Sequence, residues 1–263
     1  MADMTLKQMT RSRKLNIGTN LVEFDTPGIG HLLKYAGLEF AMIDQEYSGF
    51  GYESLKRTIG YLQTADVPAI VRVPTMRTDH IARALDLGAE GIICSPITAD
   101  DCRQIVSAMK YAPQGTRGLN TGVSHDRYTD GSVVQKMRKA NNRTTFFALI
   151  ESPEAVENAE AMASVKGVDG LWPGINDLAY ALGVPGQFNH PKVRRAHDRV
   201  AHAARAKGKS AARTAFDVRS GVALYKQGFD ILAYSGDVWV FKQAMKQGVD
   251  SIRTKCGNIN IRT

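Results

Sequence analysis

The chain has little of what several classes of protein require. Its 263 residues include three cysteines, and Cys94, Cys102 and Cys256 have neither the even count of a disulfide framework nor the spacing of a metal site. No apolar run approaches the roughly 18 residues that a membrane-spanning helix needs. Residues 1–7 contain no apolar core of a signal peptide. We therefore expect a cytoplasmic protein without a membrane partner.

The charge of the chain is positive but is not concentrated. Lys and Arg total 34 against 26 Asp and Glu, which gives a net charge of +8. The densest basic runs, at 11–14 and 194–209, contain no interleaved aromatic residues and match no nucleic-acid-binding motif. We therefore expect no nucleic-acid partner. The excess charge should lie on a solvated surface and attract anionic substrates.

What the chain does contain is a regular alternation of strand and helix signals, with glycine or proline between them. The strand signals are apolar, partly β-branched runs, which are typical of buried parallel strands. They cover residues 15–23, 38–44, 68–73, 90–94, 145–151, 168–173, 209–214 and 229–234. The helix signals cover residues 28–36, 53–64, 77–87, 99–110, 154–164, 191–206, 216–227 and 237–248.

Eight strand–helix units predict an α/β fold, the (β/α)8 TIM barrel, because an open doubly wound sheet usually has fewer strands. We expect a single domain over residues 1–263. Its core is expected at about 15–248, with an N-terminal arm at 1–14 and a polar, peripheral tail at 249–263.

Two segments interrupt the alternation. Residues 112–143 make a connection so long that it is expected to serve a function, as a lid or a subunit contact. It contains His125, the one histidine for which we consider a functional role. Residues 178–190 are expected to form a loop above the rim of the barrel.

Polar side chains close four of the predicted strands. Asp44 and Glu46 end one strand, Arg72 ends the next, and Glu151 and Asp177 end two more. The carboxyl ends of barrel strands share one rim, where TIM-barrel enzymes hold their catalytic groups. One acidic residue at such a place is usually a helix cap or an ion-pair partner, but four strand ends together favour a functional site.

Carboxylates on this rim point to a divalent metal. Glu151 and Asp177 are the candidate ligands, because hard oxygen donors suit Mg²⁺ or Mn²⁺. A keto acid that chelates such an ion would have its enolate stabilised. Either Asp44 or Glu46 is expected to point into the barrel mouth and orient metal-bound water.

The same rim offers groups for an anionic substrate. Arg72 can hold a developing oxyanion or a carboxylate, because its guanidinium stays charged and presents a fork of donors. The backbone N–H groups of Gly174, Ile175 and Asn176 precede a predicted helix start and could cradle a carboxylate.

The order and spacing of several motifs resemble those of a known family. The motifs are Ile43-Asp44-Gln45-Glu46-Tyr47, Val71-Arg72-Val73-Pro74, Ala84-Leu85-Asp86-Leu87-Gly88-Ala89, Tyr111-Ala112-Pro113-Gln114-Gly115-Thr116-Arg117-Gly118, Ile150-Glu151 and Gly174-Ile175-Asn176-Asp177-Leu178. Over residues 15–248 the chain resembles the HpcH/HpaI aldolases, which act on 2,4-dihydroxyhept-2-ene-1,7-dioate or 2-dehydro-3-deoxyglucarate. These are metal-dependent class II aldolases of the wider phosphoenolpyruvate/pyruvate barrel group.

The resemblance carries its own expectations. It implies Glu151 and Asp177 as metal ligands and Arg72 as the residue on the substrate. It also implies that Asp86 reaches the site of a neighbouring subunit. Members are typically hexamers, trimers of dimers in which the last helix is packed on or exchanged with a neighbour.

Two positions depart from the family pattern. Tyr47 stands where the family usually has an acid/base histidine, and Leu149 stands where it often has glutamine. A phenol has an unperturbed pKa near 10, and neighbouring carboxylates should raise the pKa of Tyr47 further. Tyr47 is therefore expected to donate a proton or act as a steric wall, which leaves a changed reaction or substrate open.

The sequence therefore predicts a divalent-metal-dependent carbon–carbon lyase of the class II aldolase type, acting through a metal-bound pyruvate- or oxaloacetate-like enolate. Arg72, Tyr47 and Asp44 are its candidate catalytic residues. The alternatives are a diverged decarboxylase or other lyase on a keto-diacid, and a barrel that binds metal and keto acid without aldol turnover. The sequence does not identify the electrophile.

Overall fold

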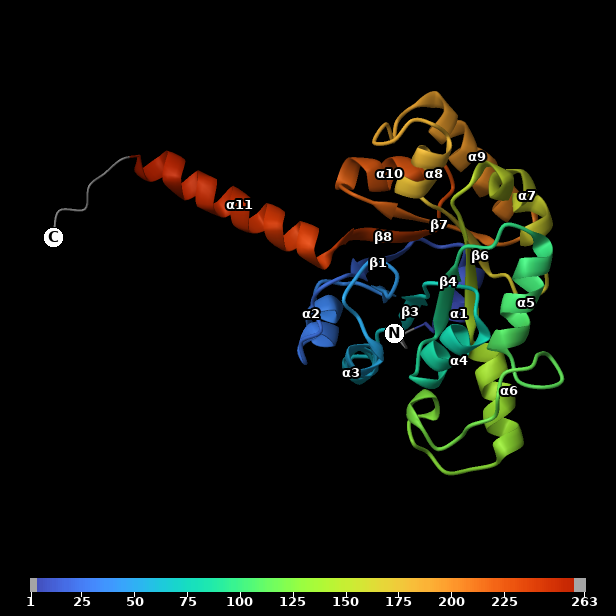
Figure 1. The fold of residues 1–263 in the computed structure, drawn as a ribbon. Coiled ribbons are helices and arrows are strands. Elements are labelled where there is room, and N and C mark those ends of the chain that lie inside the picture. The colour runs from blue at the N-terminus through green and yellow to red at the C-terminus, as the bar shows by residue number, and fades with distance from the viewer. Residues whose placement is uncertain (1–3, 258–263) are drawn as a thin grey trace.

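Eight parallel strands close into a barrel with helices around its outside (Figure 1). The structure is a computed structural model in which residues 4–257 are described. Each strand pairs with the next one along the chain, and the last strand closes the barrel on the first. The predicted (β/α)8 barrel is confirmed.

Each predicted strand and helix overlaps an observed one. The strands are β1 (Asn16–Leu21), β2 (Phe40–Asp44), β3 (Ala69–Arg72), β4 (Gly91–Cys94), β5 (Thr145–Ile150), β6 (Gly170–Pro173), β7 (Ser210–Ala215) and β8 (Ile231–Gly236). The predicted helices are α2 (Ile29–Tyr35), α3 (Tyr52–Thr64), α4 (Thr78–Asp86), α5 (Ala99–Met109), α7 (Pro153–Ala163), α9 (Pro191–Ala206), α10 (Val218–Lys226) and α11 (Asp237–Cys256). Helices that the alternation did not predict are α1 (Leu6–Ser12), α6 (Val133–Arg143) and α8 (Asn176–Ala181).

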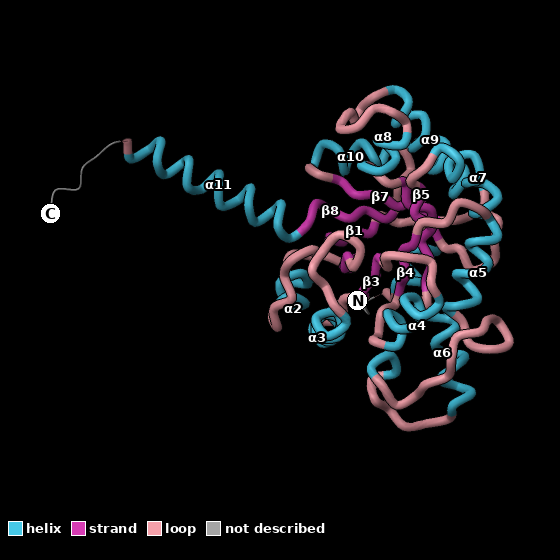
Figure 2. The backbone as a smooth tube through the Cα atoms, viewed as in Figure 1, coloured by secondary structure: helices cyan, strands magenta, loops and turns pink. Residues whose placement is uncertain are grey.

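The strands lie inside the ring of helices and are buried on both faces, which explains their continuous apolar sequences (Figure 2). Phe40, Ile70 and Phe147 fill the interior of the barrel, whereas the residues that alternate with them, such as Ala41 and Val71, pack beneath the helices. Because side chains alternate along a strand, every second residue at a strand's carboxyl end also faces the barrel mouth.

The segment expected as an N-terminal arm contains helix α1. Leu6 and Met9 are buried in the same cluster as the residues inside the barrel. Thr5 caps the helix by accepting a hydrogen bond from the Gln8 backbone N–H, and the Gln8 side chain accepts one from Thr5 in return. The arm is therefore part of the barrel core. The sequence did not indicate this role, because the seven residues of α1 include only two apolar ones.

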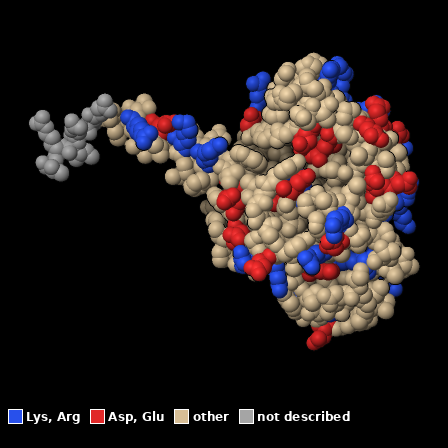
Figure 3. Space-filling view, in the orientation of Figure 1, with Lys and Arg blue, Asp and Glu red and all other residues tan. Residues whose placement is uncertain are grey.

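Helix α11 projects away from the barrel (Figures 1 and 2). It runs to Cys256, so the first part of the expected tail at 249–263 continues the helix, while residues 258–263 lie outside the described part. None of its residues is buried. Lys and Arg side chains spread along it (Figure 3), and Phe241 and Met245 are more than half exposed. Within residues 4–257 no helix has the length and apolar character needed to cross a membrane.

Candidate active site

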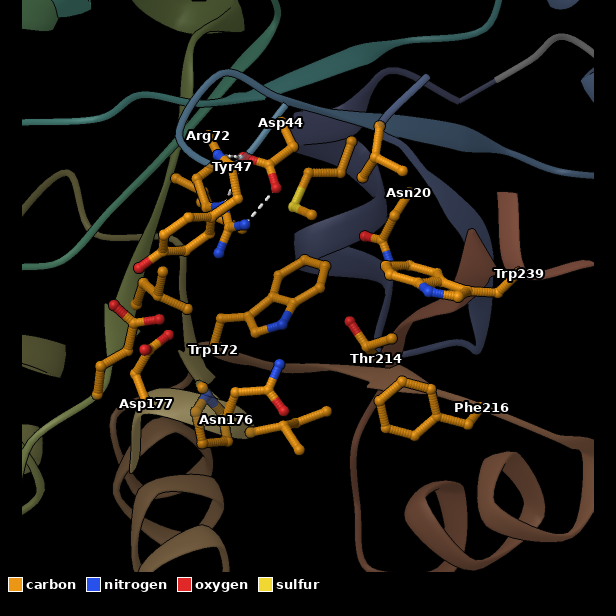
Figure 4. Close-up of a pocket in the computed structure, with 18 residues that line it drawn as sticks. Asn20, Asp44, Tyr47, Arg72, Trp172, Asn176, Asp177, Thr214, Phe216 and Trp239 are labelled. Carbon is orange, nitrogen blue, oxygen red and sulfur yellow. Dashed lines mark hydrogen bonds and ion pairs between the residues drawn. The ribbon is translucent and has the colours of Figure 1, made fainter. Parts of the chain in front are cut away.

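A cavity of about 160 Å³ opens at the carboxyl ends of the strands (Figure 4). It brings together most of the side chains predicted to form a site. The predicted residues that line it are Asp44, Tyr47, Arg72, Glu151, Gly174, Ile175, Asn176 and Asp177. Glu46 contacts Arg72 at the same rim, with 3.6 Å between its Oε2 and Arg72 Nε.

Asp44 and Arg72 form a buried ion pair at one side of the cavity. They are register partners at the ends of the adjacent strands β2 and β3. Arg72 Nε donates to Asp44 Oδ1 at 3.0 Å, and Nη2 donates to Oδ2. Asp44, with 3% of its surface exposed, also accepts the backbone N–H groups of Glu46 and Tyr47 at 2.8 and 3.2 Å. Its carboxylate therefore fixes both the guanidinium and the turn after β2.

The charges of Arg72 and Glu46 respond differently to this environment. Burial lowers the pKa of Arg72, but the hydrogen bond and negative charge of Asp44 outweigh it, so the net pKa of Arg72 is raised. Burial raises the pKa of Glu46 despite the opposing charge of Arg72. Arg72 stays a cation, and Glu46 accepts a proton more readily than a glutamate in water does.

Glu151 and Asp177 lie on the other side of the cavity. Glu151 directly follows β5, and Asp177 lies in the first turn of α8. Ser95 Oγ donates to Glu151 Oε2 at 2.6 Å. Burial raises the pKa of Glu151 to about 7, and the negative charges of Asp177 and Glu46 act in the same direction. Within the described chain, neither Glu151 Oε1 nor the Asp177 carboxylate receives a hydrogen bond. The arrangement concentrates uncompensated negative charge that a cation would neutralise.

Gly174 makes the turn between β6 and α8 possible. A Cβ atom at this position would lie 2.6 Å from Glu151 Cγ, so any side chain would displace the carboxylate. The Gly174 N–H donates to the Ile150 carbonyl at 2.9 Å, and its own carbonyl accepts from His197 Nε2 at 3.1 Å. Because that N–H is already used, a carboxylate cradle here would depend on Ile175 and Asn176.

Tyr47 covers the outer side of the ion pair. Its side chain is 66% exposed, and the Arg72 guanidinium carbon lies 4.8 Å from the ring centroid. Figure 4 shows the phenol directed toward the side of the cavity where Asp177 lies. Desolvation and the charges of nearby carboxylates, Glu46 first among them, raise the pKa of Tyr47. The shift has the direction expected from the sequence, with desolvation as its largest cause.

The opposite wall is largely aromatic and was not predicted from the sequence. Trp172, Phe216 and Trp239 line it together with Thr214 (Figure 4). Trp172 is the residue before the last in a predicted strand, so the alternation of inward-facing residues is a signal that marks it. Phe216 and Trp239 follow β7 and β8 and carry no comparable signal. Ser95 was not predicted as a site residue either, although its position directly after a predicted strand marks it as a candidate.

Glu46 lies at the rim without lining the cavity, and two other predicted functional residues lie farther from it. Asp86 accepts hydrogen bonds from the Arg117 guanidinium of its own chain, and its contact with a neighbouring subunit stays a prediction. His125 is buried in the long connection, where its Nε2 lies 2.8 Å from the Asn120 carbonyl and 3.4 Å from Tyr111 Oη. These contacts favour a structural role for His125.

Comparisons with known proteins agree with this geometry. The family model described as HpcH/HpaI aldolase/citrate lyase matches residues 33–244. A 5-keto-4-deoxy-D-glucarate aldolase from Klebsiella pneumoniae is 31% identical over 224 residues, which are 84% of this chain and 86% of that protein. An HpcH/HpaI aldolase structure from Desulfitobacterium hafniense matches with a TM-score of 0.90 and 28% identity, over 95% of this chain and 97% of that one. A family structure from Burkholderia cenocepacia gives a TM-score of 0.88 and 27% identity, over 94% and 98%.

Proposed function

The chain belongs to the HpcH/HpaI aldolase/citrate lyase family, and from this membership and the cavity we propose that it is a divalent-metal-dependent carbon–carbon lyase acting on a 2-keto acid. The observation that carries the proposal is the convergence of Glu151, Asp177 and Arg72 on one cavity from three different strand ends. The curated relative from Klebsiella pneumoniae is named for a keto acid, which supports the same class of substrate.

The donor set fits Mg²⁺ or Mn²⁺. Glu151 and Asp177 supply hard oxygen atoms. Within the described chain, Glu151 Oε1 and both oxygens of Asp177 accept no hydrogen bond, so they are available to a metal ion. No cluster of three or more His, Cys, Asp or Glu suited to a metal occurs in residues 4–257. Two protein carboxylates match the way Mg²⁺ is usually held, because it keeps several positions for water and substrate. When bound, such an ion would supply Lewis-acid polarisation of the keto group.

The chain's own residues would orient the keto acid and stabilise its charge. Arg72 is held in place by Asp44, and the N–H groups it does not use for that pair can donate to a substrate oxyanion or carboxylate. Ser95 fixes one oxygen of Glu151. Gly174 lets the chain pass close to that carboxylate. Each contact places a donor or acceptor before the substrate arrives.

Tyr47 favours a second candidate reaction. No histidine lines the cavity among the described residues, and the raised pKa of Tyr47 makes it a poor base at neutral pH. Loss of CO2 from oxaloacetate needs enolate stabilisation but no base to deprotonate a hydroxyl, unlike aldol cleavage. A decarboxylase or related lyase on a keto-diacid therefore stands as the alternative.

The two reactions can be separated with the full chain. We expect oxaloacetate decarboxylation that depends on Mg²⁺ or Mn²⁺ and is lost with EDTA, measured as pyruvate formation above the metal-only rate. Retro-aldol activity on 4-hydroxy-2-keto acids should accompany it if the proposed lyase function holds. Decarboxylation alone would favour the second reaction. No activity above the metal-only rate in either assay would refute both.

We also propose that the protein is a homo-oligomer, with a hexamer built as a trimer of dimers as the expected form. Support comes from α11, which projects from the barrel without burying a residue and exposes Phe241, Met245 and Ile252. Such a helix gains stability when its apolar side packs on another subunit. A neighbouring subunit would also bring Asp86 to the site, as the family resemblance implies. The cytoplasmic location stays a prediction.

A further inference from the structure

A second cavity lies at the opposite end of the barrel. It encloses about 510 Å³ between α1, the ends of α5 and α6, and the segments that enter β6 and β7. These segments all precede strands, so the cavity faces away from the rim that carries Glu151 and Asp177. We call it the basal cavity.

The basal cavity has an excess of positive charge. The charged residues among those that line the basal cavity are five basic ones and one carboxylate: Lys7, Arg11, Lys110, Lys166, Lys209 and Asp169. Asp169 is already committed, because its Oδ2 accepts Lys7 Nζ at 2.6 Å and the Phe146 backbone N–H at 2.9 Å. The remaining basic groups have no carboxylate partner in this cavity.

Lys110 is the least compensated of these groups. It has 6% of its surface exposed, and its ammonium donates to the carbonyls of Asn141 and Thr144 and to Thr144 Oγ1, at 2.5 to 2.9 Å. All three acceptors are neutral, so the charge is solvated but not balanced. Burial, with the charge of Lys7 in addition, lowers the pKa of Lys110 to about 7, although the negative charge of Asp169 acts in the opposite direction. Near neutral pH the amine therefore holds its proton only part of the time, and an anion nearby would favour the protonated form.

Other basic groups are available to contact such an anion directly. Arg11 and Lys166 are exposed, and their side chains form no hydrogen bond or ion pair with any described residue. Lys209 Nζ donates to the Val168 carbonyl at 2.7 Å, which leaves it further protons to donate. Scattered solvated lysines would explain these three groups alone. They do not explain a cavity of about 510 Å³ or the burial of Lys110 at its wall.

We propose that the basal cavity binds a small polyanion that carries two or more phosphoryl or carboxylate groups. Its volume falls in the range of small-molecule sites, about 300–1,000 Å³. Arg11 and Lys166 would contact the ligand, Lys209 would add a third donor, and Lys110 would contribute its charge from beneath. The site is separate from the proposed reaction, because none of its lining residues lines the catalytic cavity.

Calorimetry on the full chain in EDTA, with inorganic pyrophosphate and with citrate as separate probes, tests this proposal. We expect one site per chain, and at least tenfold weaker binding when Arg11→Gln and Lys166→Gln are combined, because charged hydrogen bonds are lost. Arg195→Gln with Lys192→Gln removes the same charge from exposed positions of α9 and should leave binding unchanged. The stronger of the two probes identifies the phosphoryl or carboxylate class.

The catalytic cavity must be excluded as the place of binding. Arg72→Gln removes its cation, and we expect this variant to bind the preferred probe as the unaltered chain does. Binding that is lost with Arg72→Gln but kept by the Arg11 and Lys166 double variant would overturn the proposal. Absence of binding to the unaltered chain at millimolar probe would also overturn it.

Discussion

Replacing His197 by glutamine should remove part of the protein's sensitivity to acid. His197 lies on α9 with 1% of its surface exposed, and its Nε2 donates to the Gly174 carbonyl. Within the described residues its Nδ1 has no hydrogen-bond partner. Burial, with the charge of Arg213 in addition, lowers the pKa of His197 to about 3. The folded protein therefore holds this imidazole neutral over a pH range in which the unfolded chain protonates it.

The direction of the effect follows from proton binding. With an unfolded pKa near 6.5 and a folded pKa of about 3, the unfolded state binds the extra proton between these values, so stability falls as pH drops through 6.5. Linkage gives a loss of about 1.4 kcal/mol at pH 5.5 and about 2.7 kcal/mol at pH 4.5, relative to pH 8. Raised carboxyl pKa values, such as that of Glu151, act in the opposite direction. Only a comparison of variants isolates the histidine.

Urea denaturation at about pH 8, 5.5 and 4.5 measures this difference, using protein treated with EDTA. Glutamine at position 197 can still donate to the Gly174 carbonyl but does not titrate, so His197→Gln should lose less stability on acidification by the amounts given above. His202→Gln, on the exposed side of the same helix, should behave as the unaltered protein does. Equal losses in the unaltered protein and in His197→Gln would refute the reasoning.

Three further predictions concern the proposed site and assembly. Glu151→Gln or Asp177→Asn should abolish Mn²⁺ binding in calorimetry, because each removes one of two charged ligands; unchanged affinity in both would show that the metal site is elsewhere. Tyr47→His should raise pyruvate proton exchange or aldol cleavage by about 10²-fold, within the usual range for an acid–base group, while Tyr47→Phe should leave metal and keto-acid binding nearly unchanged. The reverse pattern in those assays would mean that the phenol itself carries the chemistry. Phe241→Asp with Met245→Asp should break the oligomer in light scattering, and an unaltered protein that is a fully active monomer would contradict the proposed assembly.

The barrel could be predicted because its strands are buried on both faces. Residues 146–150 are apolar throughout, which is the pattern that a sheet covered by helices on both faces requires. Helix α1 escaped detection because Leu6 and Met9 contribute only one turn of apolar periodicity. The sequence indicates the start of helix α8 near Asn176, but its six residues are too short to show a period, so the part of α8 within residues 178–190 was expected to be loop. The capping box of Thr5 and Gln8 is a local signal for α1, but the apolar pattern of either segment alone does not show a helix.

The site also contains some residues that the sequence marks and others that it does not. Glu151, Asp177 and Arg72 could be found because charge at the end of an apolar run is visible locally, and the barrel brings all such ends to one rim. Phe216 directly follows β7 and Trp239 lies in the first turn of α11, so their place in the cavity depends on the path of the chain after β7 and β8. His197 acts through the Gly174 carbonyl from a helix distant in sequence, and no motif marks that contact.

The paired hydrogen bonds between Arg72 and Asp44 have a consequence for the entropy of binding. A free arginine side chain loses about 2 kcal/mol of rotamer freedom when it is fixed in one conformation. Here folding has already immobilised the side chain, because two of its N–H groups are bound to a carboxylate with 3% exposure. A lysine at the same position could place a charge there, but its single ammonium could not form the same planar pair. An incoming keto acid therefore meets a guanidinium whose orientation is already set, and little of its binding energy is needed to order this side chain.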